Sequence, residues 1–277
     1  MRWVVRFGYD GSAFYGWARQ PGLPTVEGEI LRGIVRSGLV PSAARAELEV
    51  ASRTDRGVSA VANALALTTD RSGPVVLRAL NGVSPGMFFT AAAPLPPDFR
   101  VRRALRRVYR YYEPAGGHDL GRWQSAARLF AGTVDVRSLG RGLPSDAPVW
   151  RTVESVGVEP RGEVLVVEVR APSFVWGMVR KIVAALREVD RGRLSSARLS
   201  AALAGRTRLT LPMAEPEGLV LWEVEYPFAW QVQWTGPNRH QSRWWGSQRG
   251  SLRVRSGLLD ALEQGLRTGA PGSRALS

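Results

Sequence analysis

The sequence contains no cysteine and only two histidines, His118 and His240. The first absence excludes disulfides, thiolate nucleophiles and cysteine-ligated zinc, and neither histidine has a partner at the spacing of a metal site. The single lysine, Lys181, lies inside an expected helix, which excludes a P-loop enzyme. An enzyme built on this chain must therefore use Asp, Glu, Tyr, Ser, Thr or Arg, and we expect no metal and no cofactor.

Long apolar runs are missing as well. No stretch of 18 apolar residues occurs, and the N-terminal segment lacks the apolar core of a signal peptide. We therefore expect a cytoplasmic protein with no membrane contact.

Acidic residues are few beside the basic ones. Asp and Glu number 24 against 38 for Lys and Arg, which gives a formal net charge of +14. A surplus of this size favours a polyanionic partner. Because arginine binds phosphate through two hydrogen bonds and stacks on bases, its dominance over lysine favours nucleic acid. A GC-rich genome explains the ratio of arginine to lysine equally well, but it does not explain the sign of the net charge.

The hydrophobic pattern indicates an α+β protein. Alternating apolar residues predict strands over 87–95 and 106–114, and Thr25 is a good N-cap for a helix that begins there. The clearest helical periodicity runs over 174–192, where apolar residues recur three and four positions apart. Strands and helices mix without regular alternation. We therefore expect two related halves, each an antiparallel sheet with helices on one face, and a cleft between them.

Proline-rich sequence near 94–97 suggests where the halves meet. We expect an N-terminal half over 1–96, a C-terminal half over 97–227 and an Arg/Trp-rich extension over 228–277. Two interpretations of the extension remain open. In the first, the extension contacts RNA by stacking and phosphate binding. In the second, it forms a strand and turn that cover the sheet edge, followed by a terminal helix. The first rests on five arginines with no acid between them: Arg239, Arg243, Arg249, Arg253 and Arg255.

One short segment, "ASRTDRGVSA" at 51–60, places Asp55 between two arginines, which is not a core-packing pattern. Taken alone, Asp55 reads most simply as a turn residue. Other motifs accompany it in a fixed order: "YDGSAFYGWARQP", "TVEGEI", "LNGVSP", "DFRVRRALRRVYRYY", "SFVWGMVRKIVAALREVDRGRLS" and "AEPEGLVLWEVEYP". With these motifs, residues 2 to about 227 resemble the tRNA pseudouridine synthase A (TruA) family. Any one motif is weak, but seven in family order are specific.

The resemblance implies an isomerase that converts uridine to pseudouridine. This reaction involves no redox step, no phosphate transfer and no metal. One ionised carboxylate must attack C1′ of the ribose or remove the C2′ proton, and a nearby cation favours its charged form. Motif by motif, the resemblance assigns the carboxylate to Asp55 and the cation to Arg180. It assigns to Tyr109 the ring that packs on the target base, to Arg53 the filling of the gap left by the flipped nucleotide, and to Leu219 the lining of the uracil pocket.

The resemblance also implies a homodimer that binds tRNA and modifies positions 38, 39 and 40 of the anticodon stem-loop. We expect a phosphate-binding surface that combines Arg19 with a basic segment containing Arg102, Arg103, Arg106 and Arg107. The chain departs from the family pattern at Ser52, Ser59, Arg100 and Val101, and its "VSPGMF" segment lacks the family's acid. We expect these departures to affect the fit of the flanking nucleotides and not the reaction.

Other functions fit the sequence less well. A non-catalytic RNA-binding module would share the basic surface, yet the chain lacks an RRM aromatic signature and a KH-type loop. A metal-dependent nuclease needs clustered acids, whereas Asp55 is flanked by arginines. The open alternative is a pseudouridine synthase that acts on other tRNA positions or on another RNA, because it would share every catalytic residue.

Overall fold

The computed structural model describes residues 1–82, 86–144, 148–234 and 236–268, with side chains up to residue 259. Its helices are α1 (Val26–Arg36), α2 (Gly73–Asn81), α3 (Leu120–Arg128), α4 (Met178–Asp190), α5 (Ser196–Leu203) and α6 (Arg239–Thr268). Its strands are β1 (Arg2–Tyr9), β2 (Glu49–Val50), β3 (Ser59–Thr68), β4 (Met87–Leu95), β5 (Arg106–Pro114), β6 (Gly132–Asp135), β7 (Trp150–Val153), β8 (Ser155–Arg161), β9 (Val164–Ala171), β10 (Leu219–Glu225) and β11 (Val232–Gln233).

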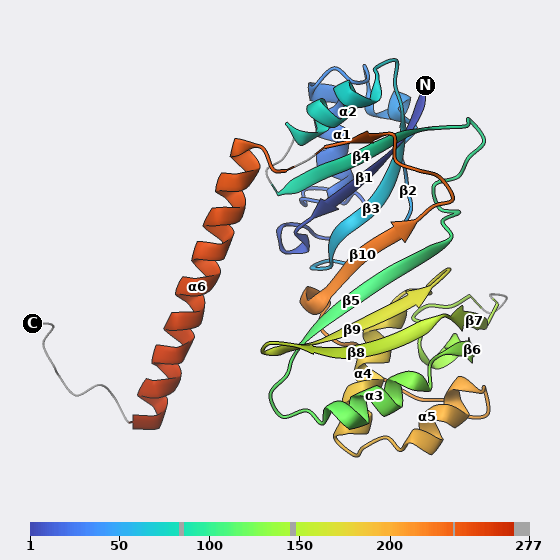
Figure 1. Cartoon of the computed structure of the whole chain (residues 1–277), viewed down its shortest axis with the longest axis vertical. Coiled ribbons are helices and arrows are strands. Elements are labelled where there is room, and N and C mark those ends of the chain that lie inside the picture. The colour runs from blue at the N-terminus through green and yellow to red at the C-terminus, as the bar shows by residue number, and fades with distance from the viewer. Residues whose placement is uncertain (83–85, 145–147, 235, 269–277) are drawn as a thin grey trace, which may run out of the picture.

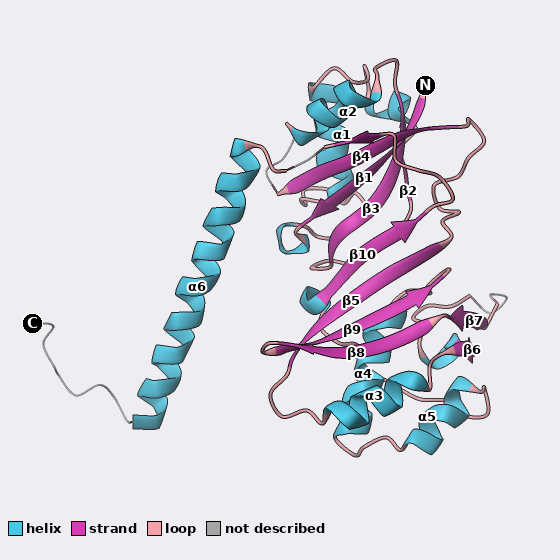
Figure 2. Ribbon diagram, viewed as in Figure 1, coloured by secondary structure: helices cyan, strands magenta, loops and turns pink. Residues whose placement is uncertain are grey.

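One mostly antiparallel sheet runs through the length of the molecule (Figure 1). Its strand order is β11-β4-β1-β3-β10-β5-β9-β8, with β2 added beside β3. Helices α1 and α2 lie at the β4 end and helices α3, α4 and α5 at the β8 end, while α6 stands apart (Figure 2). This arrangement confirms the predicted α+β class.

The two predicted halves join edge to edge within this sheet. Strand β10 lies between β3 and β5, pairing in parallel with β3 through Val220 and Leu221, and antiparallel with β5. Segments from both halves therefore meet at the centre of the sheet. The loop that carries Asp55 leads directly into β3, and Tyr109 lies on β5, so the central strands bring these residues together.

Helix α4 begins later than the periodicity predicts. The apolar pattern extends back to Phe174, but Gly177 has φ +78°, a left-handed conformation, and the helix starts at Met178. Glycine adopts this conformation without the steric cost that a Cβ atom brings. As a result, Trp176 lies in the loop before the helix and Arg180 lies in the first helical turn.

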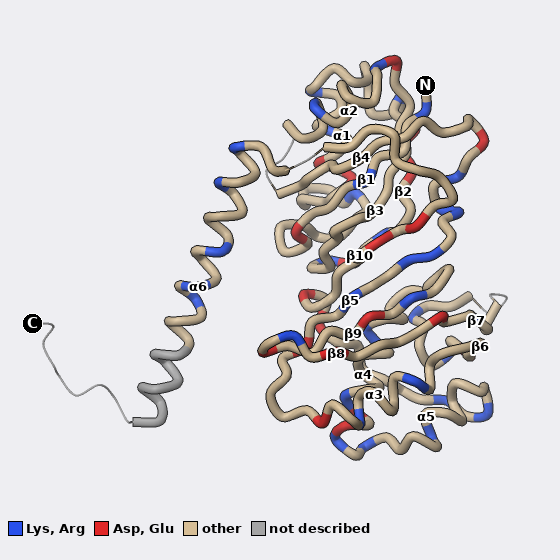
Figure 3. The backbone as a smooth tube through the Cα atoms, in the orientation of Figure 1, with Lys and Arg blue, Asp and Glu red and all other residues tan. Residues whose placement is uncertain are grey.

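The extension after residue 227 contains both an edge strand and a long helix. Strand β11 pairs with β4, as the structural interpretation predicted, and helix α6 leads away from the body. The start of α6 is anchored by Gln241, whose amide nitrogen donates to Asn81 Oδ1 at 3.0 Å and to the Met87 carbonyl at 2.9 Å. Basic residues recur along its described part (Figure 3). The tail "APGSRALS" at 270–277, which we expected to be disordered, lies outside the described residues.

Among the described helices, none combines the length and the apolar composition that spanning a bilayer requires.

Candidate active site

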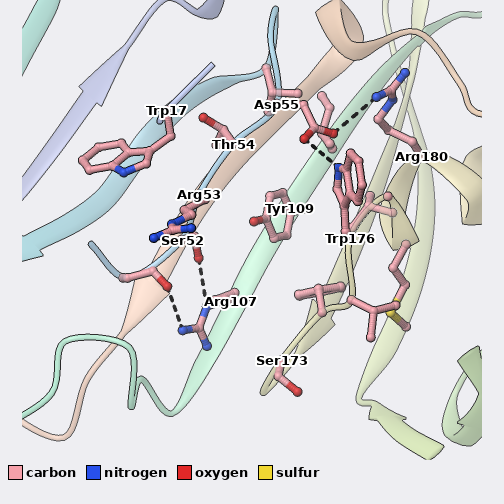
Figure 4. A pocket seen from close by; sticks show the side chains of 18 of the residues that line it. Trp17, Ser52, Arg53, Thr54, Asp55, Arg107, Tyr109, Ser173, Trp176 and Arg180 are labelled. Carbon is pink, nitrogen blue, oxygen red and sulfur yellow. Dashed lines mark hydrogen bonds and ion pairs between the residues drawn. The ribbon is translucent and has the colours of Figure 1, made fainter. Parts of the chain in front are cut away.

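A cavity of about 730 Å³ opens over the central strands, and both halves of the chain line it. Its walls include seven of the residues predicted to act in catalysis or RNA binding: Arg53, Asp55, Arg102, Arg107, Tyr109, Arg180 and Leu219. The cavity thus unites side chains that are far apart in sequence (Figure 4).

Asp55 begins a tight turn that neighbouring segments hold in place. The Val58 amide donates to the Asp55 carbonyl at 3.2 Å, and Gly57 has φ +80°. Just before the turn, the buried hydroxyl of Thr54 lies 2.6 Å from the Tyr9 hydroxyl. The loop at Gly16, with φ +91°, packs so closely that a Cβ atom there would lie 3.1 Å from the Arg56 nitrogen. The backbone at Asp55 is therefore fixed from two sides.

The carboxylate of Asp55 accepts one contact on each oxygen. Arg180 Nη1 lies 3.4 Å from Oδ2, and the Trp176 indole nitrogen donates to Oδ1 at 2.8 Å. Arg180 is itself held because its Nε donates to the Ala214 carbonyl at 2.5 Å. The Asp55 side chain keeps 32% of its surface exposed, so a substrate can still reach it. Two donors therefore orient this carboxylate at an open site.

An apolar wall lies beside the carboxylate. The Tyr109 ring on β5 packs edge-on against Phe174, with centroids 5.0 Å apart, and the buried side chain of Leu219 on β10 lines the same cavity. Burial raises the pKa of the Tyr109 hydroxyl, so this group stays protonated at neutral pH. A flat apolar surface next to a carboxylate suits a planar base whose ribose faces the charge.

Comparison with known proteins identifies the family. A family model described as tRNA pseudouridine synthase matches residues 126–227. The tRNA pseudouridine synthase A of Thermococcus kodakarensis is 41% identical over 229 residues, which cover 82% of this chain and 85% of that protein. The enzyme of the same name from Pyrococcus abyssi is 37% identical over the same shares. The chain belongs to the tRNA pseudouridine synthase A family. It is therefore an isomerase that forms pseudouridine in tRNA.

The likeness to solved structures is weaker. A chain in the crystal structure of a Cbf5-Nop10-Gar1 complex matches with a TM-score of 0.36 and 13% identity. The match covers 78% of this chain and 47% of that one.

The predicted RNA-binding arginines of this family member fall into separate environments. Arg53 and Arg102 are exposed and line the cavity. Arg19 and Arg103 are exposed but lie outside the cavity wall, and Arg19 lies 3.9 Å from the Glu27 carboxylate. Arg106 was predicted to contact phosphate as well. It pairs instead with the carboxylates of Glu154 and Glu225, so it is not free to bind phosphate.

Arg107 is buried, which corrects its predicted place on a phosphate-binding surface. Its Nε donates to Ser52 Oγ at 2.9 Å, Nη1 to the Pro172 carbonyl at 2.7 Å, and Nη2 to the carbonyls of Ala51 and Arg102 at 3.1 and 2.7 Å. Burial lowers the pKa of this guanidinium, because its charge is removed from water. Arg107 thus ties three segments of the cavity wall together.

We expect Arg107→Met to destabilise the fold by about 3 kcal/mol, because it leaves several buried acceptors without a donor. Urea denaturation monitored by tryptophan fluorescence measures this loss. The control is Arg103→Met, an exposed neighbour, which should change the unfolding free energy by less than about 0.5 kcal/mol. Equal unfolding free energies for the two variants would contradict the role of Arg107 in joining the three segments of the cavity wall.

The sequence interpretation missed Trp176. This residue lies in the segment just before α4, and its contact with Asp55 spans 121 residues of sequence. The only signal was a large aromatic residue directly before Gly177, the glycine that precedes the first residue of α4. Among the described residues, no group of three or more His, Asp or Glu side chains is placed to hold a metal ion.

Proposed function

We propose that this enzyme isomerises uridines at positions 38, 39 and 40 of the tRNA anticodon stem-loop, with Asp55 as nucleophile or base. The observation that carries the proposal is the Asp55 carboxylate, held between Arg180 and Trp176 beside the apolar wall formed by Tyr109 and Leu219.

The proposed reaction starts at the ribose. Asp55 attacks C1′ and displaces uracil at N1, which forms a C1′–O bond, or it removes the C2′ proton as uracil leaves, which forms a glycal. On either route the electron pair of the N1–C1′ bond goes to uracil. The uracil then turns and C5 bonds to C1′. On the first route this bond displaces the carboxylate; on the second, the C2′ proton is returned. Finally C5 loses its proton to solvent, and N1 gains one, so the product is an isomer of the substrate.

Each neighbour of Asp55 has a role in this scheme. Arg180 holds the carboxylate through its contact with Oδ2 and aims it at the ribose. Tyr109 and Leu219 confine the detached uracil while it turns. The raised pKa of Tyr109 favours this packing role, since a neutral phenol accepts the C5 proton only if it passes its own proton on.

A uridine in a stem must leave its stack before it reaches Asp55. Arg53 lies two residues before Asp55, is exposed and lines the cavity, which supports its proposed role of filling the gap in the stem. The dispersed arginines, including those on α6, suit contacts with the tRNA backbone over a long path. Such contacts position a nucleic acid without reading its bases, which allows several neighbouring uridines to react.

The reaction is tested by following tritium released to water from tRNA labelled at uracil C5. The wild type should release tritium with or without a chelator, and sequencing should map pseudouridine to positions 38, 39 and 40. Release with modification at other tRNA positions would favour the alternative, a synthase of the same superfamily with another target. No release from any tRNA would refute the proposed activity.

An isolated anticodon stem-loop should be a poor substrate. We expect its kcat/KM to lie about ten-fold or more below that of full-length tRNA, because contacts to the rest of the tRNA are lost. Affinity for full-length tRNA should fall steeply with salt, in proportion to the number of phosphates neutralised. Equal rates for hairpin and full tRNA at moderate salt would show that recognition is local.

The proposal includes a cytoplasmic homodimer in which each tRNA touches both subunits, and the family resemblance is what supports it. Light scattering should give about twice the 30.3 kDa mass of one chain. A mass near 30.3 kDa with and without tRNA would contradict the dimer.

A further inference from the structure

A second pocket, of about 700 Å³, adjoins the first at the carboxylate. Both pockets are lined by Asp55, Trp176 and Arg180, so these three side chains form a shared wall. The remaining walls of the second pocket come from Ser12, Phe14, Tyr15, Arg56, Gly57, Arg141, Met213, Pro216 and Glu217. The target uridine, as proposed above, occupies only the first pocket.

In the second pocket, two exposed aromatic rings are each in contact with an arginine guanidinium. The Arg56 guanidinium carbon lies 4.2 Å from the centre of the Tyr15 ring, and that of Arg141 lies 4.8 Å from the Trp176 ring. The rings are 36% and 53% exposed, respectively, although large aromatic side chains are usually well buried. Within the described residues, no carboxylate lies within 4.0 Å of a guanidinium nitrogen of Arg56 or Arg141.

This combination fits one nucleotide. A base stacks on an aromatic ring or on the plane of a guanidinium, and the same guanidinium binds phosphate. The volume lies within the range of small-ligand pockets. Besides Asp55, the lining contains the acid Glu217, and a ribose hydroxyl is a group that donates to a carboxylate.

RNA continues on both sides of the target uridine, so an adjacent nucleotide must pass close to Asp55 when the uridine is bound. We propose that the second pocket binds a nucleotide directly next to the target, with its base stacked on the pair of Tyr15 and Arg56 and its phosphate held by Arg141. This inference rests on the proposed function. Because Trp176 is shared by both pockets and donates to Asp55, the bound neighbour fixes the wall that orients the carboxylate.

The test is a double-mutant cycle that combines a substitution in the protein with a change in the RNA. The measured quantity is kcat/KM for tritium release. The substrates are full-length tRNA with an intact sequence, with an abasic nucleotide 5′ of the target, or with one 3′ of it. For the wild type, one abasic neighbour should lower kcat/KM roughly ten-fold to a hundred-fold, the range that loss of one stacked base gives. In Tyr15→Ala, the intact tRNA should show a similar loss, and the same abasic change should cause no further decrease.

The matched control is Trp222→Ala, which removes the aromatic partner of Arg110. That guanidinium lies 3.8 Å from the Trp222 ring, and neither residue lines either pocket. This variant should respond to the abasic neighbour as the wild type does. If Tyr15→Ala does not fold, as judged by its thermal melt, the exposed Arg56→Gln takes its place in the cycle.

The outcomes separate the two proposals. Loss of the abasic effect in the Tyr15 or Arg56 variant, but not in the Trp222 variant, supports the second pocket. Additive losses, or a wild type insensitive to both abasic neighbours, overturn the inference while the proposed activity stands. A wild type that releases no tritium from intact tRNA overturns the proposed function and, with it, this inference.

Discussion

Asp55→Asn is expected to lower tritium release from tRNA by more than about 10³-fold, the upper part of the range for loss of a general base or nucleophile. The amide keeps the size of the carboxylate and an acceptor for the Trp176 indole, but it carries no charge and is a poor nucleophile. The loss should appear in kcat. Affinity for tRNA should change little, because phosphates, and not the carboxylate, supply most of the binding energy.

Two controls separate a chemical effect from a structural one. The Asp55 side chain is 32% exposed, so the Asn variant should keep the thermal unfolding midpoint of the wild type to within a few degrees. Asp70→Asn, at a carboxylate that is 84% exposed beside Arg71, should leave kcat unchanged. Tritium release by Asp55→Asn at the wild-type rate would remove Asp55 from the proposed mechanism.

Strands β4 and β5 were predictable because their signals are local. The predicted strands over 87–95 and 106–114 match β4 and β5 residue for residue. In β5, half-exposed residues recur between buried ones. This is expected for a strand of which one face is covered more fully than the other. The N-cap at Thr25 is also confirmed, since its hydroxyl accepts from the Gly28 amide at 3.3 Å.

Features set by tertiary contacts were not predictable in the same way. Arg106 and Arg107 are adjacent in sequence, yet the first is paired with surface acids and the second is buried among carbonyls. Successive side chains of a strand point to opposite faces, but sequence alone does not say which face another segment covers. The start of α4 was missed for a related reason, because only the backbone conformation of Gly177 interrupts the apolar period.

Two of the departures from the family pattern form internal hydrogen bonds. The Ser52 hydroxyl accepts from Arg107 at 2.9 Å, and the Ser59 hydroxyl accepts from the Gly11 amide at 2.9 Å. Both contacts lie at the ends of the loop that carries Asp55. These serines therefore support the loop from within the protein, and their effect on flanking nucleotides stays a prediction.

Arg180→Ala should lower kcat by about 10²-fold, because loss of a positioning contact lets the carboxylate depart from the geometry that the reaction needs. Two contacts define this role: Nη1 lies 3.4 Å from Asp55 Oδ2, and Nε donates to the Ala214 carbonyl at 2.5 Å. The side chain is only 15% exposed, so it presents little surface to phosphate. Affinity for tRNA should therefore change by a few-fold at most.

Arg180→Lys separates charge from geometry. Lysine keeps the positive charge but lacks the planar fork that reaches both the Ala214 carbonyl and Asp55, so its kcat should lie between those of Arg180→Ala and the wild type. The matched comparison is Arg102→Ala, at an exposed arginine of the same cavity. That variant should raise KM and reduce the salt dependence of binding, while kcat stays near the wild-type value. If Arg180→Ala instead raises KM with kcat unchanged, Arg180 is a phosphate ligand, and another group must hold Asp55 in place.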